Sequence, residues 1–359
     1  MAPIRIAVIG AGYWGAKLAR EYAAIESSTN EASLSMVVDS YAPALNSVSA
    51  ELGQNGRTFS TDYQDAIRSD RVDAVHIALP TPLHYATARS ALEAGKHVLV
   101  EKPMASTSRE AFKLASLAEQ TGLVLQVGHI FRFNSALKMV RKMIHEGRIG
   151  KVYYAKLEWT VDQIPSGDRD IVFDLAPHPI DVLNYMLDEW PVNVDAMGES
   201  YHRKKESLEE MAFINLEFPD RITANVYLSW IQPGSKDRLV RIVGEEGTLF
   251  CDALNQTVTL QTKKDVSEIP RSLFPKLQSN GNGHAPDLMN DGKVPNNTMR
   301  DMQLHFVDTI KNRGPELNSA LIGARTVEVL EAITRAMRMR RGVQTQQRYS
   351  PPLSQEVAP

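Results

Sequence analysis

The chain has 359 residues, of which 43% are hydrophobic and 23% charged, and its formal net charge is −3. This composition is typical of globular proteins, and the length predicts two domains. The charge gives no signal for binding nucleic acid or an anionic membrane, and the single cysteine, Cys251, excludes a disulfide framework or a cysteine-rich zinc site. No apolar run approaches the roughly 18 residues of a membrane-spanning helix. Because the N-terminus also lacks the signal-peptide pattern, we expect a cytoplasmic protein.

The first forty residues predict a dinucleotide site. Residues 4–9 are a β-branched apolar run that leads into a glycine-rich turn and then into a helix-favouring segment. A strand, such a turn and a helix in this order are typical of a Rossmann fold, in which the helix N-terminus faces the pyrophosphate. The glycines would permit the tight turn, the approach of the phosphate and the packing of the helix on the strand. The expected cofactor contacts here are Gly10, Gly12, Tyr13, Trp14 and Gly15.

The next strand, residues 34–38, ends in Asp39 and Ser40. An acidic residue at this position suits the two hydroxyls of an adenosine ribose and would repel the 2′-phosphate of NADP. We therefore expect both residues to contact the cofactor and NAD to be favoured over NADP. The alternative is that Asp39 only caps a turn.

Strands and helices then alternate, which predicts a doubly wound parallel sheet. Strands are expected at 72–79, 96–100 and 123–128, and helices at 84–94 and 109–120. Because ligands of such sheets bind at the carboxyl ends of the strands, the residues there are candidates for the cofactor site. They are Leu79, Pro80, Thr81, His84, Glu101 and Lys102.

The second half of the chain predicts strands and two late helices. Residues 152–161 and 211–228 have the pattern of long strands, and 239–243, 248–251 and 257–262 that of shorter ones. Residues 299–312 and 320–338 predict amphipathic helices. The polar stretch at 265–298 indicates a lid, an oligomer arm or a disordered insertion. The domains expected are 1–128 and 129–345, followed by a flexible tail at 346–359.

Several motifs together resemble the Gfo/Idh/MocA family, named for glucose–fructose oxidoreductase and inositol dehydrogenase. They are Thr81-Pro82 with His84, Glu101-Lys102-Pro103, Gly128-His129 with Arg132-Phe133-Asn134, Asp174-Leu175-Ala176-Pro177-His178-Pro179-Ile180-Asp181, and Ser229-Trp230-Ile231-Gln232-Pro233 with Lys236, Arg238 and Gly244-Glu245-Glu246-Gly247. The similarity spans roughly residues 4 to 340. It implies a Rossmann domain and a C-terminal α/β domain with a large, mostly antiparallel open sheet, used for a homodimer or homotetramer.

The pair Asp174 and His178 carries the expected chemistry. The two residues are four positions apart, so in the first turn of one helix they would share a face. Oxidation of an alcohol needs a base for the hydroxyl proton, and histidine is the usual one. The resemblance implies that His178 is this base, that Asp174 orients it or binds a substrate hydroxyl, and that Lys102 hydrogen-bonds the developing oxyanion. Spacing alone leaves open whether Lys102 or His178 takes the proton, and Asp174 as a helix N-cap is the structural alternative.

Other polar and aromatic residues have a functional and a structural interpretation. By resemblance His129, Arg132 and Asn134 face the domain cleft and bind substrate; the alternative is interdomain salt bridging and capping. Trp159 and Trp230 could stack on a sugar, but a place in the core is favoured. The nine histidines show no metal-ligand spacing, so we expect metal-free dehydrogenation.

The substrate is expected to be a sugar-type alcohol. Many relatives carry a glycine-rich run before the catalytic aspartate, whereas this chain has residues 168–173 with the sequence DRDIVF. The motif around His178 and the Ser-Trp-x-x-Pro run resemble members that act on nucleotide sugars, such as UDP-N-acetylglucosamine 3-dehydrogenases. The alternatives are a myo-inositol or monosaccharide dehydrogenase, an NAD-dependent glycosidase of the same family, and an inactive dinucleotide sensor.

Overall fold

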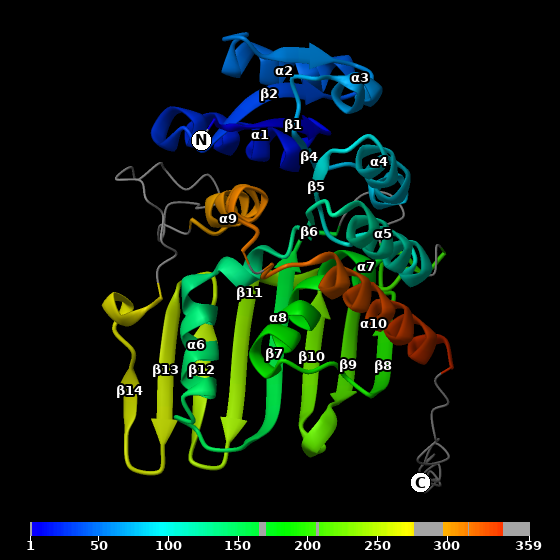
Figure 1. Cartoon of the computed structure of the whole chain (residues 1–359). Helices are drawn as coiled ribbons and strands as arrows, with labels where there is room; N and C mark the ends of the chain where they lie inside the picture. Colours follow the sequence, from blue (N-terminus) through cyan, green and yellow to red (C-terminus); the bar gives the residue numbers. More distant parts are fainter. Residues whose placement is uncertain (1, 165–169, 206–207, 276–296, 315, 340–359) are drawn as a thin grey trace, which may run out of the picture.

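The computed structural model describes residues 2–164, 170–205, 208–275, 297–314 and 316–339. The chain forms two sheets, one above the other in Figure 1. The upper sheet has six parallel strands in the order β3-β2-β1-β4-β5-β6. These strands are β1 (Ile4–Ile9), β2 (Ala32–Val38), β3 (Thr58–Ser60), β4 (Ala74–Ile77), β5 (His97–Val100) and β6 (Leu125–Val127). The predicted doubly wound sheet is confirmed.

Helices cover both faces of this sheet. They are α1 (Tyr13–Thr29), α2 (Ala42–Leu52), α3 (Tyr63–Arg68), α4 (Thr81–Glu93) and α5 (Ser108–Thr121). The central strands β1 and β4 are buried over most of their length, as expected for strands covered on both sides. The ends of the strands are left accessible, and Lys102, just after the carboxyl end of β5, contacts Asp174 of the second half of the chain, so the carboxyl edge faces the second domain.

The second sheet has eight strands in the order β14-β13-β12-β11-β7-β10-β9-β8. Its strands are β7 (Val152–Asp162), β8 (Asn193–Glu199), β9 (Met211–Glu217), β10 (Thr223–Ser229), β11 (Ile231–Gly244), β12 (Gly247–Asp252), β13 (Thr257–Thr262) and β14 (Val266–Glu268). All neighbours are antiparallel except β7 and β10. The predicted large, mostly antiparallel sheet is therefore confirmed.

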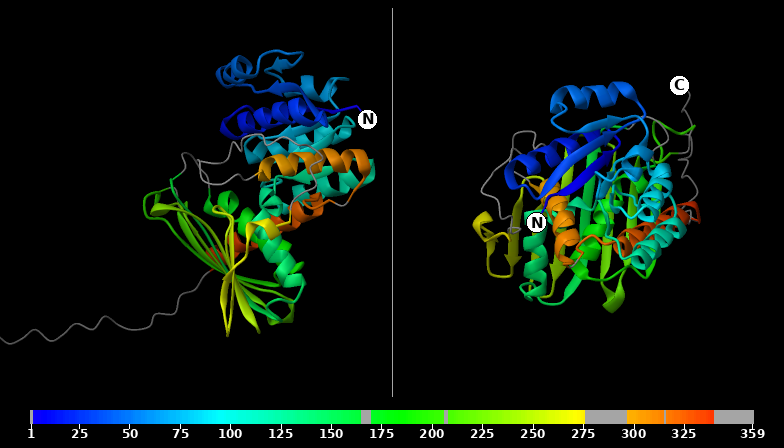
Figure 2. Two further views of the ribbon diagram at one scale, coloured as in Figure 1. Left: turned by 90° about the vertical axis from the view of Figure 1, so that its left-hand side faces the viewer. Right: turned by 45° about the horizontal axis from the view of Figure 1, so that its top comes forward.

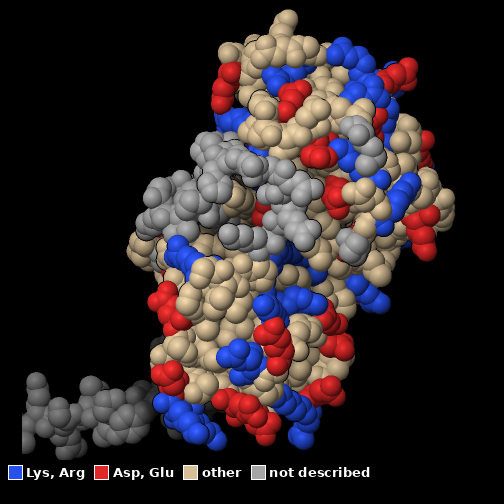
Figure 3. Space-filling model, turned by 60° about the vertical axis from the view of Figure 1, so that its left-hand side comes forward, with Lys and Arg blue, Asp and Glu red and all other residues tan. Residues whose placement is uncertain are grey.

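Helices α6 (Ser135–His145), α8 (Pro177–Leu187) and α10 (Ala320–Met339) lie on one face of this sheet (Figures 1 and 2). The alternating burial along β9 puts every second side chain on the opposite, exposed face. Trp159 and Trp230 are 0% and 2% exposed, which confirms that they belong to the core. On the face shown in Figure 3, Lys and Arg side chains are interspersed with Asp and Glu.

The last helices return to the first domain. Helix α9 (Thr298–Asn312) packs on α1, where Arg300 pairs with Glu21 at 2.9 Å. Helix α10 packs on α5, and Gly323 lies so close to β6 that a Cβ would come within 2.4 Å of Val127. Helices α9 and α10 thus hold the two sheets together, while the boundary after residue 128 stays a prediction.

Three details differ from the sequence prediction. The strand expected over 211–228 is divided into β9 and β10 by a 3₁₀ turn (Pro219–Arg221), in which Asp220 has φ 57. Residues 239–243 are only the second part of the longer strand β11. In the polar stretch 265–298, β14 and a 3₁₀ turn (Arg271–Leu273) occupy the start, and 276–296 lie outside the described residues, as does the expected tail. In the part of the chain that is described, no helix has the length and hydropathy of a membrane span.

Candidate functional site

The glycine-rich turn between β1 and α1 is shaped by two steric requirements. Gly10 has φ +103, and a Cβ there would lie 2.4 Å from the carbonyl oxygen of Ala78. A Cβ on Gly15 would lie 1.8 Å from the carbonyl oxygen of Gly10. The turn and the contact between helix and strand therefore both require glycine, as the sequence predicts.

Gly12 has a different reason to be glycine. Its φ is −63, and a Cβ there would meet no atom within 4 Å. It is the N-cap of α1 but provides no side-chain cap, and the first turn of α1 carries no acidic residue. The open space and the free N–H groups at the positive end of the helix dipole fit a dinucleotide phosphate. Next to it, Tyr13 is 79% exposed and Trp14 is partly buried.

Asp39 lies at the carboxyl end of β2, over the same turn. One carboxylate oxygen accepts a hydrogen bond from the backbone N–H of Ala11 at 2.6 Å, and the other accepts one from Tyr41 at 2.8 Å. The side chain therefore does cap a turn, and its second role, toward a ribose, would use the remaining lone pairs. Ser40 beside it is exposed.

Leu79, Pro80 and Thr81 line the accessible edge where β4 ends and α4 begins. His84, expected at the cofactor, is 1% exposed, and its ring nitrogens lie 2.7 Å and 2.8 Å from the carbonyl oxygens of Leu79 and Pro103. These contacts join the ends of β4 and β5. They favour a structural role for His84 over a contact with the cofactor.

Glu101 lies beneath this edge in a buried polar chain. Its carboxylate is 3.3 Å from Nε2 of His76, whose Nδ1 is 3.3 Å from the hydroxyl of Tyr22. Burial would raise the pKa of Glu101, but His76 and Lys102 lower it below its ordinary value. A Cβ on Gly128 would lie 2.7 Å from this carboxylate, which explains the glycine. Glu101 thus provides a buried negative charge beside Lys102.

The structure brings Lys102 together with Asp174 from the second domain. The Lys102 ammonium donates a hydrogen bond to the backbone carbonyl of Asp174 at 2.8 Å and lies 3.7 Å from its carboxylate. Both side chains are partly accessible, at 18% and 28%. The predicted meeting of these residues across the domains is present in the fold.

The local structure around Asp174 differs from the expected single helix. Asp174 is inside α7 (Ile171–Leu175), and α8 begins at Pro177, so the two catalytic candidates lie in consecutive helices. The N-cap of α7 is Asp170, which accepts a hydrogen bond from Val172 at 2.6 Å. The capping interpretation of Asp174 is therefore wrong, and its carboxylate is available for other contacts.

His178 lies at the start of α8 with its ring edge against Phe131, at 5.0 Å between centroids. Its pKa lies well below the ordinary 6.5, because of burial and the positive charges of Lys102 and Arg238. Nδ1 is buried and has no hydrogen-bond partner among the described residues. The imidazole is thus neutral at pH 7, the form that can accept a proton, and is a weaker base than an exposed histidine.

Arg132 and Asn134, expected to bind substrate, have structural partners. The Arg132 guanidinium donates to Asp181 and to Asn184, both at 2.6 Å. Asn134 caps α6 and donates to the carbonyl of Ala253 at 2.9 Å. These contacts favour the salt-bridging and capping alternative. His129 is buried beside them, and neither of its ring nitrogens has a hydrogen-bond partner in the part of the chain that is described.

Comparison with known proteins identifies the family. A model described as an oxidoreductase family with an NAD-binding Rossmann fold matches residues 4–129, and a model of the GFO/IDH/MocA C-terminal domain matches 137–250. The chain is 33% identical over 261 residues to UDP-N-acetylglucosamine 3-dehydrogenase of Acidithiobacillus ferrooxidans. The aligned segment covers 72% of this chain and 77% of that protein. This chain belongs to the Gfo/Idh/MocA family of oxidoreductases.

Further relatives and solved structures share the family or the fold. The NAD⁺-dependent scyllo-inositol 2-dehydrogenase of Bacillus subtilis is 27% identical, covering 81% of this chain and 88% of its own length. The solved structure of the Acidithiobacillus enzyme superimposes with a TM-score of 0.77 over 94% of this chain and 98% of the other, at 26% identity. A levoglucosan dehydrogenase in complex with NADH and levoglucosan shares the fold at 19% identity, with a TM-score of 0.81 and coverage of 94% and 97%.

In this Gfo/Idh/MocA member, Arg238 is a charged residue of the site to which the sequence assigned no role. Arg238 lies on β11, and its guanidinium donates hydrogen bonds to the carbonyl oxygens of Thr160 and Asp237 at 2.8 Å and 2.6 Å. The guanidinium carbon is 5.8 Å from the centroid of the Trp159 ring. Burial lowers its pKa to about 10, and its charge acts on Asp174 and His178. The sequence motifs include Arg238, but it lies some sixty positions from Asp174 and His178, so no local pattern predicts that it acts on them.

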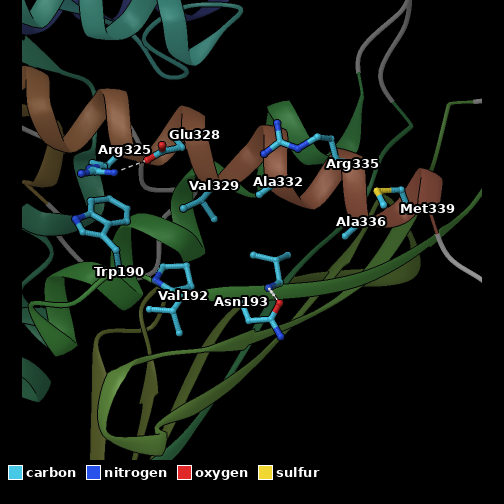
Figure 4. Close-up of a pocket in the computed structure, with 12 residues that line it drawn as sticks. Trp190, Val192, Asn193, Arg325, Glu328, Val329, Ala332, Arg335, Ala336 and Met339 are labelled. Carbon is cyan, nitrogen blue, oxygen red and sulfur yellow. Dashed lines mark hydrogen bonds and ion pairs between the residues drawn. The ribbon is translucent and has the colours of Figure 1, made fainter.

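A groove of about 400 Å³ lies elsewhere, between α10 and β8 (Figure 4). It is lined mainly by apolar side chains, including Trp190, Val192, Val329 and Met339, with an Arg325–Glu328 ion pair at one side. None of the expected site residues lines it. This groove is therefore separate from the candidate site at the carboxyl edge of the Rossmann sheet.

Proposed function

We propose that this chain is an NAD-dependent dehydrogenase that oxidises a secondary alcohol of a sugar, with a nucleotide sugar such as a UDP-N-acetylhexosamine as the favoured substrate. The observation that carries the proposal is the group formed by Lys102, Asp174 and His178 at the carboxyl edge of the Rossmann sheet. A cation, a carboxylate and a neutral imidazole there are what alcohol oxidation needs.

Each residue has a distinct task in the proposed reaction. When bound, the nicotinamide ring supplies the acceptor for the hydride. His178 accepts the hydroxyl proton, since its lowered pKa keeps it neutral. Lys102 donates a hydrogen bond to the alkoxide that forms. Asp174, whose backbone carbonyl accepts a hydrogen bond from Lys102, binds a second hydroxyl of the sugar with its carboxylate.

The substrate class rests on similarity. The relative from Acidithiobacillus is named as a UDP-N-acetylglucosamine 3-dehydrogenase and is more similar to this chain than the inositol dehydrogenase. The experiment is a spectrophotometric screen of NADH formation with UDP-sugars, free sugars and polyols. Turnover of UDP-N-acetylhexosamines above all others is expected. A preference for myo-inositol or a free monosaccharide would overturn the substrate class, and cleavage of a glycoside without net NADH would overturn the reaction.

Asp39 supports NAD over NADP. An Asp39→Asn variant removes the negative charge and keeps a side-chain oxygen for one of the two N–H groups, of Ala11 and Tyr41, that donate to the carboxylate. Because that charge would repel a 2′-phosphate, we expect the ratio of kcat/KM for NAD to that for NADP to fall by roughly tenfold. An unchanged ratio would show that Asp39 only stabilises the turn and does not select the cofactor. Asp62→Asn, at the N-cap of α3, is the matched control.

The glycine turn gives a second test of the cofactor site. Gly12→Ala is expected to keep the Tm of the free protein and to weaken NAD binding by about tenfold, because the new methyl group enters the open space beside the helix N-terminus. Gly15→Ala is expected to lower the Tm or prevent folding, because its Cβ overlaps a backbone oxygen. Calorimetric titration with NAD and thermal unfolding measure the two effects. Unchanged NAD affinity in Gly12→Ala would contradict the assignment.

We further infer a homodimer or homotetramer through the exposed face of the second sheet. Phe213 and Tyr227 stack there at 4.9 Å between ring centroids, and Phe213 is 39% exposed. An exposed aromatic pair on a sheet face that no described helix covers supports association with a second copy. Sedimentation of the native protein and of Phe213→Lys tests this inference, with dissociation expected for the variant.

A further inference from the structure

Three side chains of the Rossmann domain form a polar chain to which the proposed reaction gives no role. The hydroxyl of Tyr22, on α1, lies 3.3 Å from Nδ1 of His76 on β4, and Nε2 of His76 lies 3.3 Å from the Glu101 carboxylate. Tyr22 and His76 are each 0% exposed, whereas the Glu101 side chain is 10% exposed. The chain therefore runs outward from the core and ends in a carboxylate just after β5.

These three groups satisfy one another when each donates toward the edge. Burial raises the pKa of Tyr22, so its hydroxyl keeps its proton and can donate to Nδ1 of His76. Nε2 of His76 then donates to Glu101, which as a carboxylate can only accept. Burial also raises the pKa of Glu101, but its neighbours, and among them first the hydrogen bond from His76, bring it below the ordinary value. His76 thus holds Glu101 in place and keeps it ionised.

The Glu101 carboxylate lies on the nicotinamide side of the sheet. Strand β1 is flanked by β2 on one side and by β4 and β5 on the other. Under the proposed function Asp39, after β2, faces the adenosine, and the N-terminus of α1 faces the phosphates, so the nicotinamide extends toward β4 and β5. Glu101 directly follows β5, and a Cβ on Gly128, after β6, would lie 2.7 Å from its carboxylate. A fixed anion is thus present where the nicotinamide ring binds.

The neighbouring lysine is held by a different partner. The Lys102 ammonium donates to the backbone carbonyl of Asp174 and lies 3.7 Å from its carboxylate, in the second domain. Glu101 is held by His76, inside the first domain. The nicotinamide ring is positive in NAD⁺ and neutral in NADH, so a nearby anion stabilises the oxidised ring relative to the reduced one.

We propose that His76, with Tyr22 behind it, is a positioning residue that holds the Glu101 carboxylate toward the nicotinamide ring and thereby makes the site prefer NAD⁺ to NADH. The proposal rests on the NAD-dependent function above. By linkage, bound NAD⁺ becomes a weaker oxidant by the same factor. The carboxylate therefore favours entry of the oxidised cofactor and release of NADH after the hydride has been transferred, which suits catalysis in the oxidising direction.

The test compares the dissociation constants of NAD⁺ and NADH without sugar, so it does not depend on turnover. His76→Phe keeps a ring against Tyr22, which the imidazole contacts edge-on at 5.8 Å between centroids, but has no nitrogen for Glu101. We expect the ratio of the Kd for NAD⁺ to the Kd for NADH to rise by about tenfold, because the buried carboxylate loses the donor that keeps it ionised. His76→Gln restores an N–H donor and should keep this ratio within about threefold of the native value.

A double-mutant cycle shows whether His76 acts through Glu101. Glu101→Gln removes the charge with little change in shape and should also raise the ratio by about tenfold. In the Glu101→Gln background, His76→Phe should change the ratio by less than about twofold. His97→Phe is the matched control, because His97 lies at the opposite end of β5, where Nδ1 accepts a hydrogen bond from the backbone N–H of Val124 at 3.0 Å. It should lower the Tm and leave the ratio unchanged.

The outcomes separate the proposal from the function on which it rests. Equal weakening of NAD⁺ and NADH binding in His76→Phe would show a purely structural role and refute the proposal alone. A further change of the ratio by His76→Phe in the Glu101→Gln background would also refute it. If His76→Phe does not fold, Glu101→Gln still decides, since an unchanged ratio there would exclude the carboxylate. A native protein that binds neither cofactor would refute the proposed function and this proposal with it.

Discussion

Lys102→Met is expected to lower kcat/KM for sugar oxidation by about 100- to 1,000-fold, because the variant lacks the hydrogen bond to the developing alkoxide. Methionine has a similar length and removes the ammonium that lies 3.7 Å from the Asp174 carboxylate. The loss should fall mainly on kcat, since the interaction strengthens as the oxygen becomes negative. The native structure loses only one hydrogen bond, to the Asp174 carbonyl, so the Tm should change little.

The chain offers a matched control for this lysine. The Lys96 ammonium, just before β5, donates to the carbonyl oxygens of Ser69 and Val72 at 2.9 Å and 2.8 Å. Lys96→Met should therefore lower the Tm and leave kcat/KM within about twofold of the native value. Steady-state NADH formation and thermal unfolding separate the two variants. A Lys102→Met protein that keeps more than a tenth of the native kcat/KM would exclude Lys102 from the reaction.

The cofactor half of the site was predictable because its signals are local. A strand, three glycines and a helix lie within thirty residues. In the fold, Gly10 and Gly15 make the close backbone contacts that were expected of them. Helix α6 also has a local signal, an Asn134 cap before apolar residues at helical spacing, although the sequence predictions omit it. The edge strands β8 and β14 are short or polar and have no such signal.

The substrate half depended on contacts between distant segments. The spacing of Asp174 and His178 predicted one helix and did not show that α7 ends at Leu175 and α8 begins at Pro177. The same holds for Arg132, whose partner Asp181 lies forty-nine positions later. Motif similarity marks such residues without saying whether they touch substrate or one another. Only the fold separates these roles.

His178→Asn is expected to lower kcat by about 100- to 10,000-fold, the range for loss of a general base.

The pH dependence of the reaction gives the sharper test of His178. The neutral imidazole is the active form, so activity falls as the pH drops through the pKa of His178. Burial, Lys102 and Arg238 hold that pKa well below 6.5, so the acidic fall in kcat/KM should lie below pH 6.5. Arg238→Gln removes one positive charge, raises this pKa and should move the fall toward higher pH. His145→Asn, on the exposed end of α6, is the control and should leave both rate and profile unchanged. An acidic limb that is the same in the native and Arg238→Gln proteins would assign the proton to a group other than His178.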